Sequence, residues 1–294
     1  MKKACKLAAL ALLILAALGV ISGYLSRKLP IGDKIALINV EGAILTSKDT
    51  IDELKEYAED DSVKAIVMRV DSPGGAVVPS QEIYEEVKKA AARKKVVVSM
   101  GSVAASGGYY ISAPASRIMA NPATITGSIG VIMEIPNFKG LMEKLGVKSE
   151  VITSGKHKDM ASVFRGIGDG EREILQNVMN DIHEQFIKDV ADGRHMPLEK
   201  VRELADARIF TGRQAREVGL VDAIGNLQDA IDEAAKLANI KGKPSIVTRQ
   251  KEFSVLDYIS NGISKKIAGA SISLTGALTD ALTDGYPRVR AIAK

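Results

Sequence analysis

The sequence predicts an α/β domain built on a largely parallel sheet. From Lys34 onward, short runs rich in β-branched residues alternate with amphipathic stretches, as parallel strands alternate with crossover helices. The short runs are almost continuously apolar, which indicates strands that are buried on both faces. With 46% hydrophobic and 26% charged residues, the chain of 294 residues has enough apolar material for a sizeable core.

Strands and helices are predicted from the period of their apolar residues. Six short apolar runs are predicted strands: 34–44, 63–70, 95–100, 117–121, 128–132 and 149–154. Three stretches with apolar residues three and four apart are predicted helices: 48–60, 80–94 and 137–146. A further helix is predicted over residues 226–240, with Asn226 as its N-terminal cap.

A longer helix is predicted from about Gly170 to Asp192. One apolar stripe recurs along it every four residues: Ile174, Val178, Ile182, Phe186 and Val190. Such a stripe indicates that one face packs against the sheet or against another subunit.

The N-terminus has the composition of a membrane anchor. Three lysines among the first six residues precede Leu7–Leu25, which carries no charge and would span about 30 Å as a helix. A cleaved signal peptide is the alternative, because Ala17–Gly19 offers a site of small residues. We therefore divide the chain into an anchor and linker at residues 1–33, an α/β domain at 34–245 and a C-terminal tail of uncertain order at 246–294.

Charge and cysteine content exclude several functions. The formal net charge of +4 is spread among interspersed acids and bases, and the chain has no Trp, so nucleic acid is not an expected partner. The single cysteine, Cys5, excludes an internal disulfide and a cysteine-ligated metal site within one chain.

The segment GSVAASGGYY, residues 101–110, surrounds one serine with the smallest residues available. Ser106 follows a predicted strand and begins a predicted helix, so its hydroxyl is exposed and the N–H of Gly107 can face a developing oxyanion. Residue 104 is alanine, so the G-x-S-x-G motif does not apply. The alternative is that small residues only allow two elements to pack closely.

A second glycine loop, VDSPGGAV at residues 70–77, follows another predicted strand. Pro73 fixes a turn, while Gly74 and Gly75 leave their backbone N–H groups unobstructed. Such a loop can donate hydrogen bonds to a substrate carbonyl oxygen. An ordinary tight turn before the next helix is the alternative.

The histidines are poor candidates for a general base. His183 and His195 lie in or just after a charged helix, whereas His157 lies in a loop between Lys156 and Lys158. A lysine can replace histidine where burial keeps part of its amine neutral near pH 7. Solvated loop charges are the alternative for both lysines.

Five motifs in this order resemble the S49 family of serine peptidases, the family of signal peptide peptidases. They are VDSPGG, GSVAASGGYYIS, NPATITGSIGVI, SGKHKD and FTGRQAREVGLVDAIG, within residues 34–240. The resemblance implies the Clp protease/crotonase-like ββα spiral, behind an N-terminal transmembrane helix. It implies no metal and no cofactor.

By this resemblance, Ser106 is the nucleophile and Lys158, in KHKD, is the general base, with Lys156 the weaker candidate. Ser128, in TGSIG, matches the serine that orients the lysine. Gly74 or Gly75, with Gly107, would supply the oxyanion-hole N–H groups. His157 stands where the family commonly has an aromatic residue.

The resemblance also implies an activity and a location. A Ser-Lys dyad would hydrolyse apolar peptides, such as residual signal peptides, through an acyl-enzyme. The chain would form a homo-oligomer with active sites shared between protomers, anchored by a single membrane span with the catalytic domain outside the cytoplasm. Two alternatives are a crotonase-like acyl-thioester enzyme, which leaves Ser106 and Lys158 unexplained, and an inactive membrane scaffold.

Overall fold

The computed structural model describes residues 33–249. The predicted membrane anchor lies outside these residues, and so does nearly all of the predicted C-terminal tail. Within 33–249, no helix combines the length and apolar character that a membrane crossing requires.

A mixed sheet forms the centre of the molecule, with strands in the order β6-β5-β3-β2-β1-β8, β4 on β3 and β7 on β4. All neighbouring strands are parallel except β5 and β6, which are antiparallel. Most pairs therefore agree with the prediction. The strands are β1 (Lys34–Glu41), β2 (Val63–Ser72), β3 (Lys95–Ala105), β4 (Arg117–Ala120), β5 (Ile125–Gly127), β6 (Ile209–Thr211), β7 (Ala223–Ile224) and β8 (Ser245–Val247).

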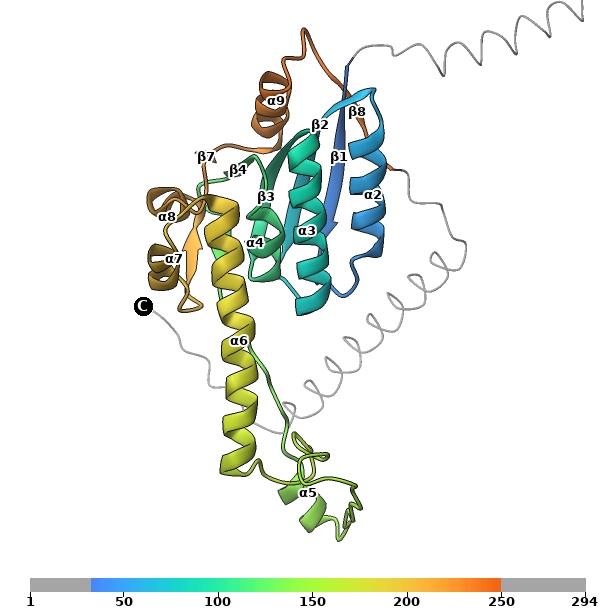
Figure 1. Ribbon diagram of the computed structural model, residues 1–294, viewed down its shortest axis with the longest axis vertical. Coiled ribbons are helices and arrows are strands. Elements are labelled where there is room, and N and C mark those ends of the chain that lie inside the picture. Colours follow the sequence, from blue (N-terminus) through green and yellow to red (C-terminus); the bar gives the residue numbers. More distant parts are fainter. Residues whose placement is uncertain (1–32, 250–294) are drawn as a thin grey trace, which may run out of the picture. The chain divides into compact units, whose positions relative to one another are not determined.

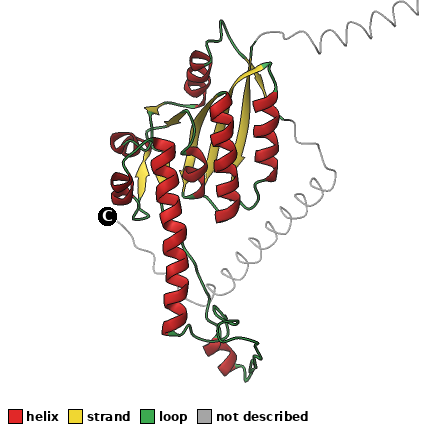
Figure 2. Cartoon of the chain, in the orientation of Figure 1, coloured by secondary structure: helices red, strands yellow, loops and turns green. Residues whose placement is uncertain are grey.

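Helices cover both faces of the sheet because successive strand residues point to opposite sides (Figures 1 and 2). Ala36 and Ile38 of β1 join the larger core, whereas Ile35 joins the smaller one. The larger core packs on α2 (Lys48–Glu59), α3 (Val77–Arg93), α4 (Gly107–Ser112), α6 (Asp169–Arg194), α7 (Leu198–Leu204) and α8 (Gly212–Val218), and the smaller on α9 (Leu227–Leu237). Asn226 caps α9 as predicted, its side chain accepting from two helix amides.

Strand β3 has two successive neighbours on one side, and this arrangement positions the site. Its first half pairs with β4 at Val97–Met100, and its second half pairs with β5 at Val103–Ala105. Ala105 is in register with Gly127. The residues that follow, Ser106 and Ser128, therefore leave the sheet side by side.

Two predicted strands are wrong. Residues 128–132 are irregular because the strand lies earlier, at β5, and residues 149–154 form an irregular segment in which Ile152 is fully exposed. Neither run has a neighbouring strand among the described residues, and an apolar run without a hydrogen-bonding partner cannot form a sheet. The predicted helix 137–146 is shorter, as α5 (Lys139–Lys144).

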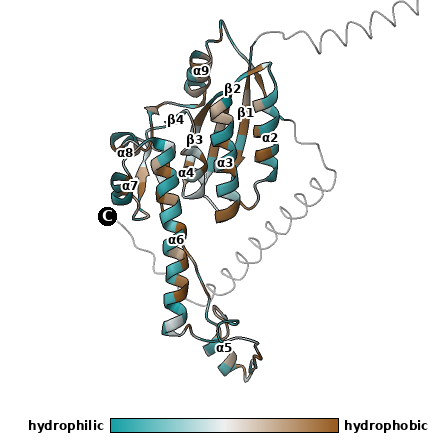
Figure 3. Ribbon diagram, viewed as in Figure 1, coloured by the Kyte–Doolittle hydropathy of each residue, from teal (hydrophilic) through white to brown (hydrophobic). Residues whose placement is uncertain are grey.

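Helix α6 is buried only toward its C-terminal end, where Phe186, Ile187, Val190 and Ala191 pack in the core. Its N-terminal half extends past the sheet, with α5 and its loops beside it (Figure 1). We call residues 132–181 the arm; none of them is buried. Figure 3 shows hydrophobic residues as brown segments of the ribbon along α6. The exposed large apolar side chains of the arm are Ile132, Met133, Phe138, Leu141, Leu145, Val147, Val151, Ile152, Phe164 and Val178.

Candidate active site

Ser106 forms the sharp turn between β3 and α4. Its backbone has φ 52° and ψ −120°, a combination that residues with a side chain seldom adopt. The turn is held on both sides: the Ser106 N–H donates to Gly127 O at 2.8 Å, and the Ser106 carbonyl accepts from Tyr110 N at 2.8 Å. The Ser106 hydroxyl caps no helix amide, and the half-buried side chain borders a pocket.

The small residues around Ser106 permit a close contact between α4 and the glycine loop after β2. A Cβ on Gly74 would lie 2.5 Å from Gly107 N, and a Cβ on Gly107 would lie 2.6 Å from Ser80 Oγ. A Cβ on Gly108 would lie 2.6 Å from Ser72 O. Close packing thus accounts for the glycines, and the same packing brings the loop amides next to the serine.

Two of the three predicted glycine amides are free to donate. Gly75 and Gly107 both border the pocket, and among the described residues neither N–H has a hydrogen-bond acceptor. The Gly75 N atom is close to Gly107, since a Cβ on Gly107 would lie 3.2 Å from it. The N–H of Gly74 instead donates to Ser72 Oγ at 3.1 Å. Gly74, at φ +96°, shapes the turn that presents Gly75.

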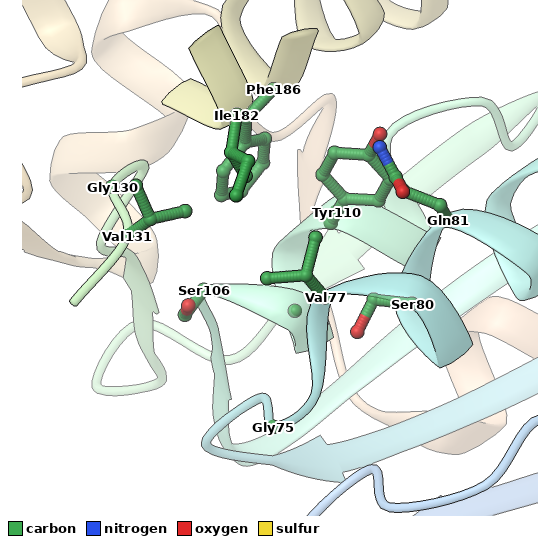
Figure 4. A pocket seen from close by; sticks show the side chains of 11 residues that line it. Gly75, Val77, Ser80, Gln81, Ser106, Tyr110, Gly130, Val131, Ile182 and Phe186 are labelled. Atoms are coloured by element: carbon green, nitrogen blue, oxygen red, sulfur yellow. The ribbon is translucent and has the colours of Figure 1, made fainter. Parts of the chain in front are cut away.

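The pocket beside Ser106 is open in part to solvent, and its walls are mainly apolar (Figure 4). Val77 of α3, Val131 and the α6 residues Ile182 and Phe186 face it. A pocket of this kind accommodates an apolar side chain. The sequence pointed to Gly75, Ser106 and Gly107 as site residues, and it marked Ile182 and Phe186 only as members of the helical stripe. It gave no sign that Val77 or Val131 would line a pocket.

The pocket residue Tyr110 is buried and pairs with the partly buried Asp189 of α6. Tyr110 stacks edge-on against Phe186, with ring centroids 4.6 Å apart, and its hydroxyl donates to Asp189 Oδ2. Burial raises the pKa of the Tyr110 hydroxyl, and it also raises the pKa of the Asp189 carboxyl, against the lowering effect of the hydrogen bond from Tyr110. The backbone carbonyl of Asp189 accepts from Tyr84 Oη at 2.9 Å.

Ser128 lies beside Ser106 but is held by a different segment. It follows β5 with φ 52°, and its N–H donates to Arg208 O at 2.8 Å. The next residue, Ile129, is fully buried, and its carbonyl lies 3.2 Å from His183 Nε2. The contacts with Arg208 and His183 hold the turn at Ser128 in place.

Lys158 lies far from Ser106 within one chain. It is exposed, as is Lys156, in a turn of the arm where its N–H donates to Gly155 O at 3.1 Å. Arg165 ties this turn to Glu171, in the first turn of α6. The pocket residue Ile182 comes 182 − 171 = 11 residues later, which is about 17 Å along a helix that rises ~1.5 Å per residue. The structure therefore brings Ser106, Ser128, Gly75 and Gly107 together and leaves Lys158 apart.

The other ionisable candidates do not border the pocket. None of the three histidines lines it, and His195 ends α6 in a left-handed conformation. In the described part of the chain, His, Cys, Asp and Glu form no group of three that could hold a metal ion.

Comparisons with known proteins match this architecture. A model of peptidase family S49 matches residues 88–241, and a Clp protease model matches residues 34–135, in keeping with an α/β fold of the Clp protease and crotonase type. A candidate protease of Synechocystis sp. is 49% identical over 209 residues, which are 70% of this chain and 75% of the relative. A candidate signal peptide peptidase SppA of Enterococcus faecium is 43% identical, over 63% of this chain and 54% of its own length. The chloroplastic serine protease SPPA of Arabidopsis thaliana is 33% identical, over 84% of this chain and 37% of its own length.

Proposed function

The chain belongs to peptidase family S49 and is a serine protease, and from that premise we propose that Ser106 is its nucleophile and Lys158 of a neighbouring protomer its general base. One observation carries the proposal. The serine occupies a strained strand-to-helix turn at the edge of an apolar pocket, beside the two free amides of Gly75 and Gly107.

The reaction follows from these positions. The neutral amine of Lys158 takes the proton from Ser106 Oγ, which attacks the scissile carbonyl carbon. The N–H groups of Gly75 and Gly107 donate to the oxyanion as it forms. Collapse of the tetrahedral intermediate expels the amine, which receives the proton from the lysine. The neutral lysine then takes a proton from water, which attacks the acyl carbon. Collapse of this second intermediate releases the carboxylic acid product, and the lysine returns the proton to Ser106 Oγ.

Two features support a base from a neighbouring protomer. Within one chain, the Lys158 turn sits at the N-terminal end of α6, about 17 Å along the helix from the pocket. The arm that carries it exposes a concentration of apolar side chains, with Ile152 at 100% and Ile132 at 88% exposure. Exposed apolar surface of this kind is typical of an interface, here with a second copy of the chain.

Ser128 is proposed to orient the lysine amine. It leaves the sheet beside Ser106, so an amine that reaches the Ser106 hydroxyl would also reach its hydroxyl. A second acceptor would fix the direction of an amine that rotates freely on a long side chain.

The proposed substrates are apolar peptides, including remnants of signal peptides. The apolar walls of the pocket support apolar substrate side chains, and the Enterococcus faecium relative carries the name of a signal peptide peptidase. The uncharged segment Leu7–Leu25 supports a single membrane span. The proposed position of the protease domain outside the cytoplasm follows from the resemblance to family S49.

Mixed assembly tests the proposal. Full-length Ser106→Ala and Lys158→Ala proteins should each fail to cleave an apolar fluorogenic peptide. When the two are dissociated together and reassembled, a Lys158→Ala protomer can meet the intact lysine of its Ser106→Ala neighbour, and activity should return. Co-assembled but inactive mixtures would rule out a base supplied between protomers. Unchanged turnover in Ser106→Ala would instead favour the scaffold alternative.

A further inference from the structure

Arg165 joins the turn that carries Lys158 to the beginning of α6. Its Nε and Nη2 donate to the two carboxylate oxygens of Asp159 at 2.8 and 2.9 Å, and Nη2 also donates to the Asp159 main-chain carbonyl at 3.2 Å. The same guanidinium donates from Nη1 to Glu171 Oε2 at 2.7 Å and from Nη2 to Oε1 at 2.5 Å. Two carboxylates from two segments are thus held by one planar group.

The far side of this contact is anchored in the helix itself. Glu171 is in the first turn of α6, and its Oε2 also accepts from the N–H of Gly168, the residue before the helix. Arg165 Nη1 donates in addition to Gly166 O at 2.9 Å. Asp159, the residue after Lys158, is therefore connected to α6 through a continuous set of hydrogen bonds.

All three groups are charged at neutral pH. The hydrogen bonds from Arg165 lower the pKa of the Asp159 carboxyl, and they lower the pKa of Glu171 to about 2, with help from the Gly168 amide. The side chains are partly shielded, at 36% exposure for Arg165, 24% for Asp159 and 13% for Glu171. An isolated surface ion pair contributes little to stability, but the bidentate hydrogen bonds of Arg165 fix the positions of the two carboxylates relative to each other.

Apart from the Arg165 contacts, main-chain hydrogen bonds hold this part of the arm, such as those from Lys158 N to Gly155 O at 3.1 Å and from Phe138 N to Val163 O at 2.7 Å. No residue from 131 to 185 is buried, so apolar packing within the chain does not hold it. Further along, Phe186, Ile187 and Val190 pack α6 firmly into the core. Helix α6 is anchored in the core at its C-terminal end and bound to the Lys158 turn at its N-terminal end. It therefore determines the position of Lys158 relative to the sheet.

We infer that Arg165 is a positioning residue for the general base: by clamping Asp159 to Glu171, it fixes the backbone from which the Lys158 side chain extends. The inference rests on the proposed catalytic role of Lys158. A lysine amine ends a flexible four-carbon stem, so its aim depends on a fixed backbone. A displacement of about 1 Å at a reacting group can cost about 100-fold in rate.

The test compares Arg165→Met with Arg202→Met in the full-length protein. Arg202 is a matched control, because it also pairs with two carboxylates, Glu184 and Glu199, and is similarly exposed at 40%. Arg165→Met should lower kcat on an apolar peptide by about 10- to 100-fold and leave KM within about twofold. Arg165→Lys should recover little, since an ammonium cannot hold two carboxylates bidentately. Arg202→Met should keep its kcat, and melting temperature and sedimentation should match between the two Met variants.

Asp159→Asn provides a second, milder variant. It keeps the shape of the side chain but removes the negative charge that pairs with Arg165. Like Arg165→Met, it should lower kcat and leave KM unchanged. If Arg165→Met fails to assemble, this variant decides. If Lys158→Ala is inactive but Asp159→Asn, or an assembled Arg165→Met, keeps the full kcat, the inference is overturned. A loss of kcat in Arg202→Met equal to that in Arg165→Met also overturns it. Full activity in Lys158→Ala would instead overturn the proposed function.

Discussion

Ser106 and Ser128 directly follow the paired last residues of two parallel strands, Ala105 and Gly127, and each has a φ of 52°. The Ser106 N–H donates to Gly127 O at 2.8 Å, and the Ser128 N–H donates to Arg208 O at 2.8 Å, so a backbone hydrogen bond holds each turn. In the proposed mechanism, an amine that approaches the Ser106 hydroxyl would also reach the Ser128 hydroxyl.

The two serines should differ in what their removal costs. Ser106→Ala should lower kcat/KM by roughly 10⁴- to 10⁶-fold, because no nucleophile remains. Ser128→Ala should lower kcat by roughly 10- to 100-fold with little change in KM, since it only loosens the orientation of the base. Steady-state kinetics on an apolar peptide, with labelling of Ser106 by a fluorophosphonate, checks both. Equal losses in the two variants would contradict the division of roles.

Backbone strain at Ser106 should be measurable. At φ 52° and ψ −120° a side chain is disfavoured, and such conformations cost of the order of 1–3 kcal/mol. Ser106→Gly should therefore unfold with a free energy about 1 kcal/mol higher than Ser106→Ala, although glycine normally destabilises a folded chain. Urea unfolding of the two inactive variants gives this comparison. A lower stability for Ser106→Gly would show that the turn is not strained.

Close packing between α4 and the glycine loop predicts a rescue. Gly107→Ala should be destabilised by about 1–3 kcal/mol, because the added Cβ would lie 2.6 Å from Ser80 Oγ. Ser80→Ala in the same chain removes that oxygen and should restore part of the lost stability. The Ser80→Ala single variant serves as the control, and thermal melts measure all three. Purely additive effects would argue against this contact.

Much of the scaffold was predictable because its signals are local. Long apolar runs predicted β1 to β4, and small residues around Ser106 marked the strand-to-helix turn that the structure contains. The strands β5 to β8 have at most three residues each, and their pairing depends on distant partners rather than on periodicity. The choice of Gly75 over Gly74 as a free amide was also beyond the sequence, since it depends on Ser72 Oγ accepting the Gly74 N–H.

The arm was mispredicted for a different reason. The apolar run at 149–154 carries the pattern of a buried strand, but within the chain nothing buries Ile152. The spacing of apolar residues in the sequence indicates that a surface is apolar, but it does not indicate whether the same chain or another molecule covers that surface.

The partly buried carboxyl of Asp189 leads to a prediction about pH. Its pKa in the folded protein lies above the ordinary value of about 3.9, mainly because burial disfavours the charged form. The folded state thus holds the proton more tightly, so this contribution to stability is present below pH ~3.9 and is lost as the pH rises through the folded pKa. Asp189→Asn keeps an oxygen for the Tyr110 hydroxyl and should lack that loss. Its stability relative to wild type should therefore rise between pH 3.5 and 7 in urea unfolding, and a constant difference over this range would contradict the prediction.

The exposed arm should matter only in the assembled protein. Ile152 is fully exposed in the single chain, so Ile152→Asp removes no packing there and should leave the melting temperature of a dissociated protomer unchanged. If a second copy covers the arm, the new charge must be buried or the contact broken, and a buried unpaired charge is expensive. The variant should sediment as smaller species and lose most peptidase activity, because Lys158 then no longer reaches a neighbouring Ser106. Lys144→Ser changes the charge of another exposed residue of the arm and serves as the control; it should sediment and cleave like wild type. An Ile152→Asp protein that sediments and cleaves like wild type would show that this part of the arm is not the contact that completes the site.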